Sequence, residues 1–426
     1  DNPDDPGLTA LYLERYLNYG LKREDLQSGK PIIGIAQSGS DLSPCNRHFQ
    51  ALSKTIKDGI REAGGVPMEF PTHPIQETGK RPTAALDRNL SYLSLVEVLY
   101  GYPIDGVILT TGCDKTTPAA LMAAATVNIP SIVLSGGPML DGNYKGKKAG
   151  SGTIIWEARK LHAKGEIDYD EFMDMAAASA PSIGHCNTMG TASSMNSIAE
   201  ALGMSLPGGA IIPAPYKERT DISFKTGKRI VEMVFENLTP SKIMTKEAFE
   251  NAVYVASAIG ASSNCPPHLT AIARHMGVDF NLDQWEKLGH SIPLLANCQP
   301  AGEHLMEGFF KAGGIPAIMK ELIKDKKLNV KALTVTGKTI EENLNMKIDV
   351  NRDVIKSYEN PLSHNAGFIV MKSNFFSSAV MKTSVISSEF RERYLSNKDS
   401  LNIFEVKAVV FEGPEDYHAR INDDNL

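Results

Sequence analysis

The six residues 110–115 (TTGCDK) decide the fold class and point to a candidate site. They follow the apolar residues 106–109 (GVIL), which predict a buried parallel strand, and they precede residues 118–125 (PAALMAAA), which predict a helix. In an open α/β sheet, ligands bind beyond the carboxyl ends of the strands. Sulfur donors suit iron or zinc and oxygen donors suit magnesium or manganese, so Cys113 and Asp114 suggest two metals. A buried cysteine beside a solvated ion pair fits these six residues equally well.

The same alternation of strands and helices extends along most of the chain. Short apolar runs predict strands at 32–36, 66–70, 105–110 and 131–134. Apolar residues at helical spacing predict helices over 46–63, 86–100 and 192–202. We therefore expect a layered αβα domain with a parallel sheet over residues 1–355.

After residue 355 the sequence pattern changes to apolar runs at 367–371, 380–386 and 406–411, with few predicted helices between them. These runs predict the start of a smaller, β-rich, barrel-like domain over residues 356–426. Because so few strands would struggle to close a core, we expect the natural polypeptide to continue beyond Leu426.

Composition narrows the class of protein. The net charge of −6 argues against nucleic acid or an anionic membrane as a partner. No apolar stretch reaches the length of a membrane span, and residues 1–6 (DNPDDP) have neither the basic nor the apolar part of a signal peptide. Five widely spaced cysteines favour metal or catalytic roles in a reducing compartment. These features predict a cytoplasmic enzyme.

Three of the cysteines share a local setting, because Cys45, Cys113 and Cys186 all fall in loops or in predicted first turns of helices. Helix N-termini lower the pKa of a thiol and favour the thiolate that a metal needs. Three thiolates without an obvious fourth ligand would leave an iron–sulfur cluster one open coordination site, which is what makes a metal centre a Lewis acid. Spacing alone favours ordinary packed thiols over a cluster, and we expect Cys265 and Cys298 to be packed core or loop thiols.

Other candidates are weaker when taken singly. Glu77 lies in a predicted loop, where it could serve a hard cation or be a surface carboxylate, and His185 is expected to be an ordinary hydrogen-bonded histidine. Residues 136–152 are rich in glycine and lysine and predict a solvated loop or a lid over an acidic substrate. This loop does not match a phosphate-binding P-loop, because Asp141 stands where that motif has glycine. A nucleotide-binding function has little support.

Four motifs closely resemble those of the dihydroxyacid and sugar-acid dehydratase family, in the family's order and along essentially the whole chain. They are SPCN at 43–46, TGCDKTTP at 111–118, LSGGPM at 134–139 and CNTMGTA at 186–192. Residues 73–83 (HPIQETGKRPT) and 411–418 (FEGPEDYH) look like the pentonate branch, which acts on D-xylonate or L-arabinonate. They look less like the branched-chain dihydroxyacid dehydratases or the 6-phosphogluconate dehydratases.

The resemblance implies a reaction and two cofactors. A [2Fe-2S] cluster would be held by Cys45, Cys113 and Cys186. A Mg²⁺ ion would be held by Glu77, Asp114 and Lys115, with the lysine carbamylated by CO₂. The implied reaction removes water from a 2,3-dihydroxy acid and gives a 2-keto-3-deoxy acid, with the open iron as Lewis acid for the 3-hydroxyl and Mg²⁺ stabilising the enolate.

Two departures from the family pattern qualify these expectations. The base of the family is a serine in a glycine-rich C-terminal segment, which we expect beyond Leu426; a non-catalytic remnant that keeps the fold is therefore an alternative. Residues 260–265 (GASSNC) stand where the family usually has GGSTNA, so Cys265 adds a thiol near the expected substrate. Large α/β enzymes are commonly homo-oligomers, and we expect a dimer or a tetramer.

Overall fold

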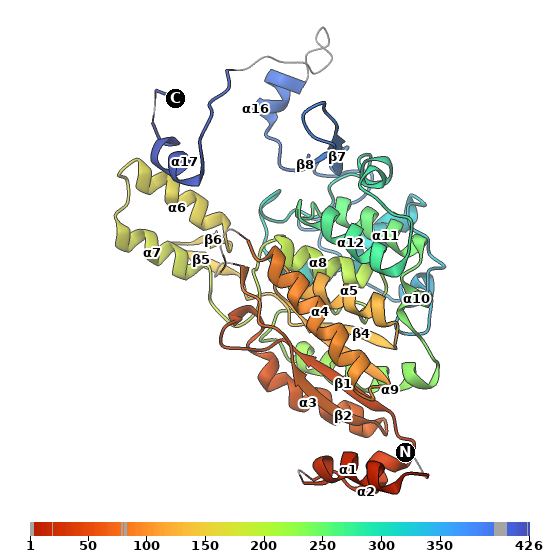
Figure 1. Ribbon diagram of the computed structural model, residues 1–426. Coiled ribbons are helices and arrows are strands. Elements are labelled where there is room, and N and C mark those ends of the chain that lie inside the picture. Colours follow the sequence, from red (N-terminus) through yellow and green to blue (C-terminus); the bar gives the residue numbers. More distant parts are fainter. Residues whose placement is uncertain (1–3, 19, 78–79, 81–82, 396–406, 424) are drawn as a thin grey trace.

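A four-stranded parallel sheet forms the centre of the molecule (Figure 1). The computed structural model describes residues 4–18, 20–77, 80, 83–395, 407–423 and 425–426. The strand order is β2-β1-β3-β4, with bounds β1 Ile32–Gln37, β2 Val66–Pro71, β3 Gly106–Thr111 and β4 Ser131–Ser135. All four predicted strands are confirmed, and the apolar runs of β3 and β4 are fully buried, as expected for strands covered on both faces.

Helices cover both faces of this sheet, which confirms the predicted layered α/β class (Figure 1). Helices α3 (Phe49–Glu62) and α9 (Lys217–Phe235) pack together on one face, and α4 (Ala85–Gly101) and α5 (Thr116–Val127) on the other. The core continues outward through four further helices: α8 (Thr191–Ala201), α11 (Lys246–Ala258), α12 (Cys265–Met276) and α14 (Gly314–Lys324).

The remaining helices are shorter or peripheral. They are α1 (Pro6–Leu17), α2 (Arg23–Gln27), α6 (Thr153–Ala163), α7 (Tyr169–Ala178), α10 (Pro240–Ile243), α13 (Met306–Lys311), α15 (Ile340–Asn343), α16 (Ser388–Phe390) and α17 (Pro414–Arg420).

The prediction of a plain loop over residues 136–152 is wrong. This segment contains an antiparallel hairpin, β5 (Gly142–Tyr144) and β6 (Lys147–Ala149). The hairpin lies against α6 and α7, where Ala149 and Met175 belong to a small separate core. Two strands of three residues each, carrying glycine and lysine, leave no apolar run for sequence reasoning to detect.

The predicted β-rich segment is confirmed in part. Strands β7 (Phe368–Met371) and β8 (Ala379–Lys382) form an antiparallel pair, and the Phe368 ring packs edge-to-face on Trp285 at 5.1 Å between ring centres. The third predicted strand is wrong for residues 407–411, which have no regular structure, while residue 406 lies outside the described ranges. The division into domains at residues 355 and 356 stays a prediction.

Helices α3 and α9 touch through glycines at their crossing. A Cβ atom added to Gly59 would stand 2.2 Å from the Phe224 carbonyl oxygen, and one added to Gly227 would stand 2.4 Å from the Ile56 carbonyl oxygen. Because main-chain atoms are in contact on both sides, a side chain at either position requires the helices to separate.

We therefore expect Gly59→Ala to lower the free energy of unfolding by about 1–3 kcal/mol, the usual cost of overpacking. Urea denaturation followed by circular dichroism measures this change. Gly101→Ala is the matched control, because a Cβ atom at Gly101 meets no atom within 4 Å. A Gly59→Ala protein as stable as the Gly101→Ala protein would contradict the tight crossing.

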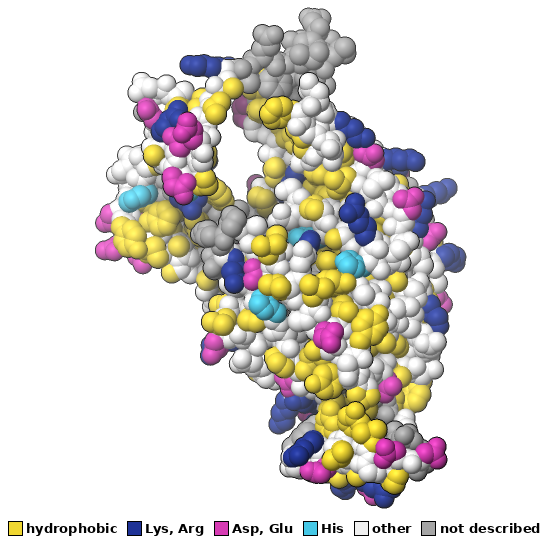
Figure 2. Space-filling view, in the orientation of Figure 1, with side chains coloured by type: hydrophobic (Ala, Val, Ile, Leu, Met, Phe, Trp, Pro, Cys, Tyr) yellow, Lys and Arg dark blue, Asp and Glu magenta, His cyan; other side chains and the backbone are white. Residues whose placement is uncertain are grey.

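Helix α4 carries a row of exposed apolar side chains, visible on the face shown in Figure 2. Leu86 is 74% exposed, Leu90 55% and Leu93 58%. Exposed apolar patches are typical of interaction surfaces, and the expected homo-oligomer stays a prediction. None of the helices in the described ranges combines the length and the apolar character needed to cross a lipid bilayer.

Candidate active site

The strand order creates a switch point at the carboxyl edge of the sheet. Strands β1 and β3 are neighbours, and the chain leaves them in opposite directions, toward β2 and toward β4. Crevices at such points are where open α/β sheets bind ligands. Cys45 follows β1 in a short 3-10 helix, Pro44–Asn46, and Cys113 follows β3 directly. Two of the predicted ligands thus flank the switch point.

Cys186 reaches the same edge through strand-like pairing. The His185 N–H donates to the Gly137 carbonyl at 3.0 Å, and the Met139 N–H donates to the His185 carbonyl at 2.9 Å. Because residues 137–139 continue from the end of β4, this pairing fixes the chain at Cys186 beyond that strand. His185 is fully buried, so burial lowers the pKa of its imidazole to about 3.

The three thiols interact with one another. The Cys45 and Cys113 thiols are hydrogen-bonded, and this contact raises the pKa of Cys45 and lowers the pKa of Cys113. Cys186 is near enough for its charge to act on Cys45, burial raises the pKa of Cys186, and the Ser151 hydroxyl donates to its sulfur at 3.2 Å. The expectation that all three thiols have lowered pKa values is therefore wrong for Cys45 and Cys186. The hydrogen bond with Cys113, followed by burial, raises the pKa of Cys45, and burial raises the pKa of Cys186.

The turn that carries Cys113 is closely fitted. A Cβ atom at Gly112 would stand 2.4 Å from the Asn46 Oδ1 atom, so only glycine permits this approach. The same Oδ1 atom accepts a hydrogen bond from the Cys113 N–H at 3.1 Å. Asn196, in α8, donates to the Gly112 carbonyl at 3.2 Å. The contacts of Asn46 join two predicted motifs, the contact of Asn196 joins one of them to α8, and together they fix the position of Cys113 relative to Cys45 and α8.

The predicted oxygen ligands also meet. The Lys115 ammonium is 2.9 Å from Glu77 Oε2 and 4.0 Å from Asp114 Oδ2, and its side chain is 5% exposed. Burial raises the pKa of Asp114, although the Ala192 N–H at the start of α8 acts in the opposite direction. Within the described ranges, no three His, Cys, Asp or Glu side chains are grouped so that they could hold a metal ion as they stand. Thr78, Gly79, Arg81 and Pro82 of the 73–83 motif lie outside the described residues.

Arg219 was not predicted from the sequence, and it supports the carboxyl edge of the sheet at the end of β4. Its side chain is fully buried and donates to the Ser135 carbonyl at the end of β4, and burial lowers the pKa of its guanidinium to about 9. A Cβ atom at Gly137 would stand 2.7 Å from Arg219 Nη2, which explains the glycines of the 134–139 motif. The residues around Arg219 in α9 carry no signal of this contact, since it arises only when α9 packs on the sheet.

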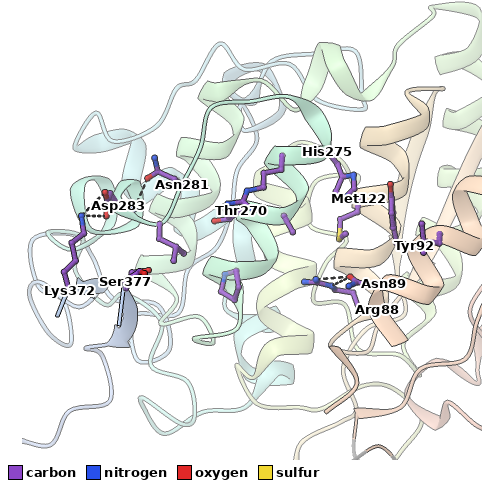
Figure 3. A pocket seen from close by; sticks show the side chains of 16 residues that line it. Arg88, Asn89, Tyr92, Met122, Thr270, His275, Asn281, Asp283, Lys372 and Ser377 are labelled. Atoms are coloured by element: carbon purple, nitrogen blue, oxygen red, sulfur yellow. Dashed lines mark hydrogen bonds and ion pairs between the residues drawn. The ribbon is translucent and has the colours of Figure 1, made fainter. Parts of the chain in front are cut away.

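A cavity of about 890 Å³ lies beside the site, between α4, α5 and α12 (Figure 3). None of the six predicted ligands lines it. Arg88, in its wall, donates to His268 Nδ1 at 2.9 Å. Burial and the charges of Arg88 and Lys115 lower the pKa of His268 to about 3.

Cys265 and Cys298 are both fully buried, as expected of packed thiols. Burial raises the pKa of each, to about 12 for Cys265. Cys265 nevertheless begins α12, immediately after the loop whose Ser262 hydroxyl shares a hydrogen bond of 2.8 Å with Thr191. The 260–265 segment therefore lies against the 186–192 motif, which carries the predicted ligand Cys186. This position is consistent with the expectation that Cys265 is near the substrate.

Comparison with known proteins gives the same grouping. The profile of the N-terminal domain of dihydroxy-acid/6-phosphogluconate dehydratases matches residues 30–343. A D-xylonate dehydratase of Caulobacter vibrioides is 59% identical over 426 residues, which is 100% of this chain and 71% of that protein. An L-arabinonate dehydratase of Rhizobium leguminosarum is 45% identical over 98% of this chain and 70% of its own length. A dihydroxy-acid dehydratase of Halothermothrix orenii is 36% identical over 94% of this chain and 72% of its own length. The chain belongs to the dihydroxy-acid/6-phosphogluconate dehydratase family, whose members are hydro-lyases.

Proposed function

We propose that this protein dehydrates a sugar acid, with D-xylonate as the first candidate, using a [2Fe-2S] cluster and Mg²⁺. The substrate class rests on one observation, the 59% identity to a D-xylonate dehydratase across the whole chain. The cofactors rest on the meeting of three thiols and three potential oxygen donors at one edge of the sheet.

The thiols fit an iron–sulfur cluster by their chemistry and their number. Thiolate sulfur is the usual ligand of such clusters, and the contact between Cys45 and Cys113 brings two thiols within ligand range of one group. Ser151 donates to the Cys186 sulfur, and hydrogen bonds to ligand sulfurs tune the potential of a cluster. In the proposal, Cys45, Cys113 and Cys186 hold the cluster.

The oxygen side fits a hard cation. Two carboxylates, Glu77 and Asp114, face one buried ammonium, so the protein already compensates their charge with a cation at this position. If the neutral Lys115 amine attacks CO₂, a nitrogen–carbon bond forms, a proton leaves, and the side chain becomes an anionic carbamate. Three oxygen donors would then surround a divalent ion, and Mg²⁺ prefers such ligands.

The chain's residues have defined tasks in the proposed reaction. Dehydration removes the C2 proton and the C3 hydroxyl, and the enol product becomes the 2-keto-3-deoxy acid. The bound metals supply Lewis acidity and charge stabilisation. Glu77, Asp114 and the Lys115 carbamate would hold the cation that pairs with the acid end of the substrate. The buried walls around Cys113 exclude water, which strengthens these electrostatic interactions.

A substrate panel tests the proposal. The protein is purified anaerobically, and its iron content and visible absorbance are recorded. D-xylonate, L-arabinonate, 6-phosphogluconate and 2,3-dihydroxyisovalerate are then compared by release of the 2-keto acid. We expect an iron-containing protein with the highest kcat/KM for a pentonate. An iron-free protein that dehydrates D-xylonate would overturn the cofactor assignment, and no turnover of any sugar acid would overturn the reaction.

A further inference from the structure

The strand β8 brings a half-buried lysine toward the candidate site from a distant part of the chain. We propose that Lys382 and Ser384 form, with the 260–264 loop, a subsite that binds the distal hydroxyl groups of the sugar acid. This inference rests on the proposed function, because it states how the same site recognises its substrate.

Lys382 is held at the loop by a hydrogen bond. Its ammonium donates to the Gly260 carbonyl at 2.7 Å, and this is its one hydrogen bond to the part of the chain that the structure describes. No carboxylate in those ranges forms an ion pair with it. Burial lowers the pKa of Lys382 to about 8, since the ammonium loses water without gaining an anion. A lysine ammonium has three protons, so two are left for another acceptor.

Ser384 presents a second unused polar group to the same place. Its Oγ atom is buried and has no hydrogen-bond partner among the described residues. A Cβ atom added to Gly260 would stand 3.3 Å from this oxygen. Lys382 and Ser384 therefore both lie against Gly260, where φ is +62° and a side chain would also crowd Leu294. Buried polar atoms are nearly always satisfied, so the unsatisfied Ser384 hydroxyl, beside an ammonium that uses one of its three protons, indicates a missing partner.

The loop that Lys382 holds leads directly to the proposed metal ligands. Asn264 donates to the Thr191 hydroxyl at 3.0 Å, and Thr191 also shares a hydrogen bond with Ser262. The N–H of the next residue, Ala192, is close enough to the Asp114 carboxylate to lower the pKa of that group. A continuous polar wall thus runs from Lys382 through the loop and the start of α8 to Asp114.

Cys265 lies between Lys382 and Asp114. The charges of Lys382 and Asp114 both act on its thiol, and Ser194 is hydrogen-bonded to it. The positive group and the proposed magnesium ligands therefore lie on a common substructure, the start of α12 and the start of α8. A molecule bound at Asp114 that extends along this wall meets Lys382 and Ser384 next.

The chemistry of a pentonate fits the two ends. Its carboxylate and its C2 and C3 hydroxyls are accounted for by the proposed metal ligands, and its C4 and C5 hydroxyls need other partners. An ammonium and a hydroxyl donate to hydroxyl oxygens, and the 262–264 side chains add further polar atoms. A site built to hydrogen-bond hydroxyls discriminates strongly against an analogue without them, because its own polar groups then stay unpaired.

The test compares two acids that differ at this distal end. The full-length enzyme is assayed with D-xylonate and with 2,3-dihydroxybutanoate, which has no hydroxyl beyond C3. For Lys382→Met we expect KM for D-xylonate to rise roughly 10- to 100-fold, as for loss of a hydrogen bond to a charged group, with kcat little changed. The KM for 2,3-dihydroxybutanoate should stay as in the unaltered enzyme. Lys382→Arg should recover most of the D-xylonate affinity, and Ser384→Ala should raise its KM by roughly 3- to 10-fold.

Lys372→Met is the matched control, because Lys372 belongs to the same hairpin region but is exposed and pairs with Asp283. A purely structural Lys382 would lower kcat/KM for both acids equally, and that result would overturn the subsite. If Lys382→Met does not fold, Ser384→Ala decides by the same comparison.

Calorimetric titration of D-xylonate separates this inference from the proposed reaction. Binding that is weakened in Lys382→Met and kept in Lys372→Met would support the subsite even if the unaltered protein dehydrates no sugar acid. Equal binding by both variants, or no binding by the unaltered protein, would overturn it.

Discussion

Replacing Cys113 by serine is expected to remove the bound iron and to abolish most sugar-acid dehydration. A serine hydroxyl is a harder donor than a thiolate and stays protonated, so it is a poor ligand for an iron–sulfur cluster. Lewis-acid activation contributes several kcal/mol, and about 1.4 kcal/mol corresponds to a tenfold change in rate, so kcat/KM should fall roughly 1,000-fold or more. Iron per polypeptide and visible absorbance measure the first effect, and steady-state kinetics with D-xylonate measure the second.

Cys298→Ser is the matched control for this prediction. Cys298 is as deeply buried as Cys113 but lies near Asp141 and Lys148. We expect the Cys298→Ser protein to keep its iron and its activity. Full iron content in Cys113→Ser would exclude Cys113 as a ligand. Equal iron loss in both variants would mean that the substitutions disturb the folded structure and do not remove a specific ligand.

Lys115→Arg should abolish activity although it keeps the positive charge beside Glu77. If Lys115 were only a partner for Glu77 and Asp114, arginine would serve as well, since a guanidinium pairs readily with carboxylates. Arginine stays protonated and cannot form a carbamate, so the proposed third oxygen donor is lost. With several kcal/mol of metal-assisted stabilisation removed, we expect kcat/KM to fall roughly 100- to 1,000-fold.

Carbon-13 NMR with labelled bicarbonate gives a readout that does not depend on activity. The unaltered protein should show a carbamate resonance, and Lys115→Arg should lack it. Titration with Mn²⁺ in place of Mg²⁺, followed by electron paramagnetic resonance, should show weaker binding by the variant. Lys57→Arg is the control, because Lys57 forms an ion pair with Glu69 and lies away from the predicted ligands. Wild-type activity in Lys115→Arg would contradict the carbamate.

The central fold was predictable because its strands are continuous apolar runs bounded by turns. Strand β3 illustrates this, since residues 106–109 are apolar, buried and followed at once by the candidate ligands. The β5–β6 hairpin was not predictable, because its strands are three residues long and lack an apolar run. The run at 407–411 has strand-like composition but no neighbouring strand in the described chain, and a strand needs a partner for its backbone groups.

The candidate site was predictable to the extent that it follows strand ends. Cys45 and Cys113 come after neighbouring parallel strands, so their meeting follows from topology. The mutual effects on thiol pKa values could not be predicted, because they depend on distances between side chains. Lys382 was missed for a related reason, since its partner Gly260 is 122 positions away along the chain.

The glycine crossing of α3 and α9 has a consequence for how robust the site is. His48, which immediately precedes α3, bonds to the Gly136 carbonyl at 2.8 Å, and Arg219 in the first turn of α9 bonds to Ser135. The two helices that brace this rim thus cross farther along, at Gly59 and Gly227, where their main-chain atoms are in contact. Exchanging apolar side chains elsewhere in the interior would leave that spacing unaltered, so the interior can vary in composition while the sulfur-bearing rim keeps its dimensions.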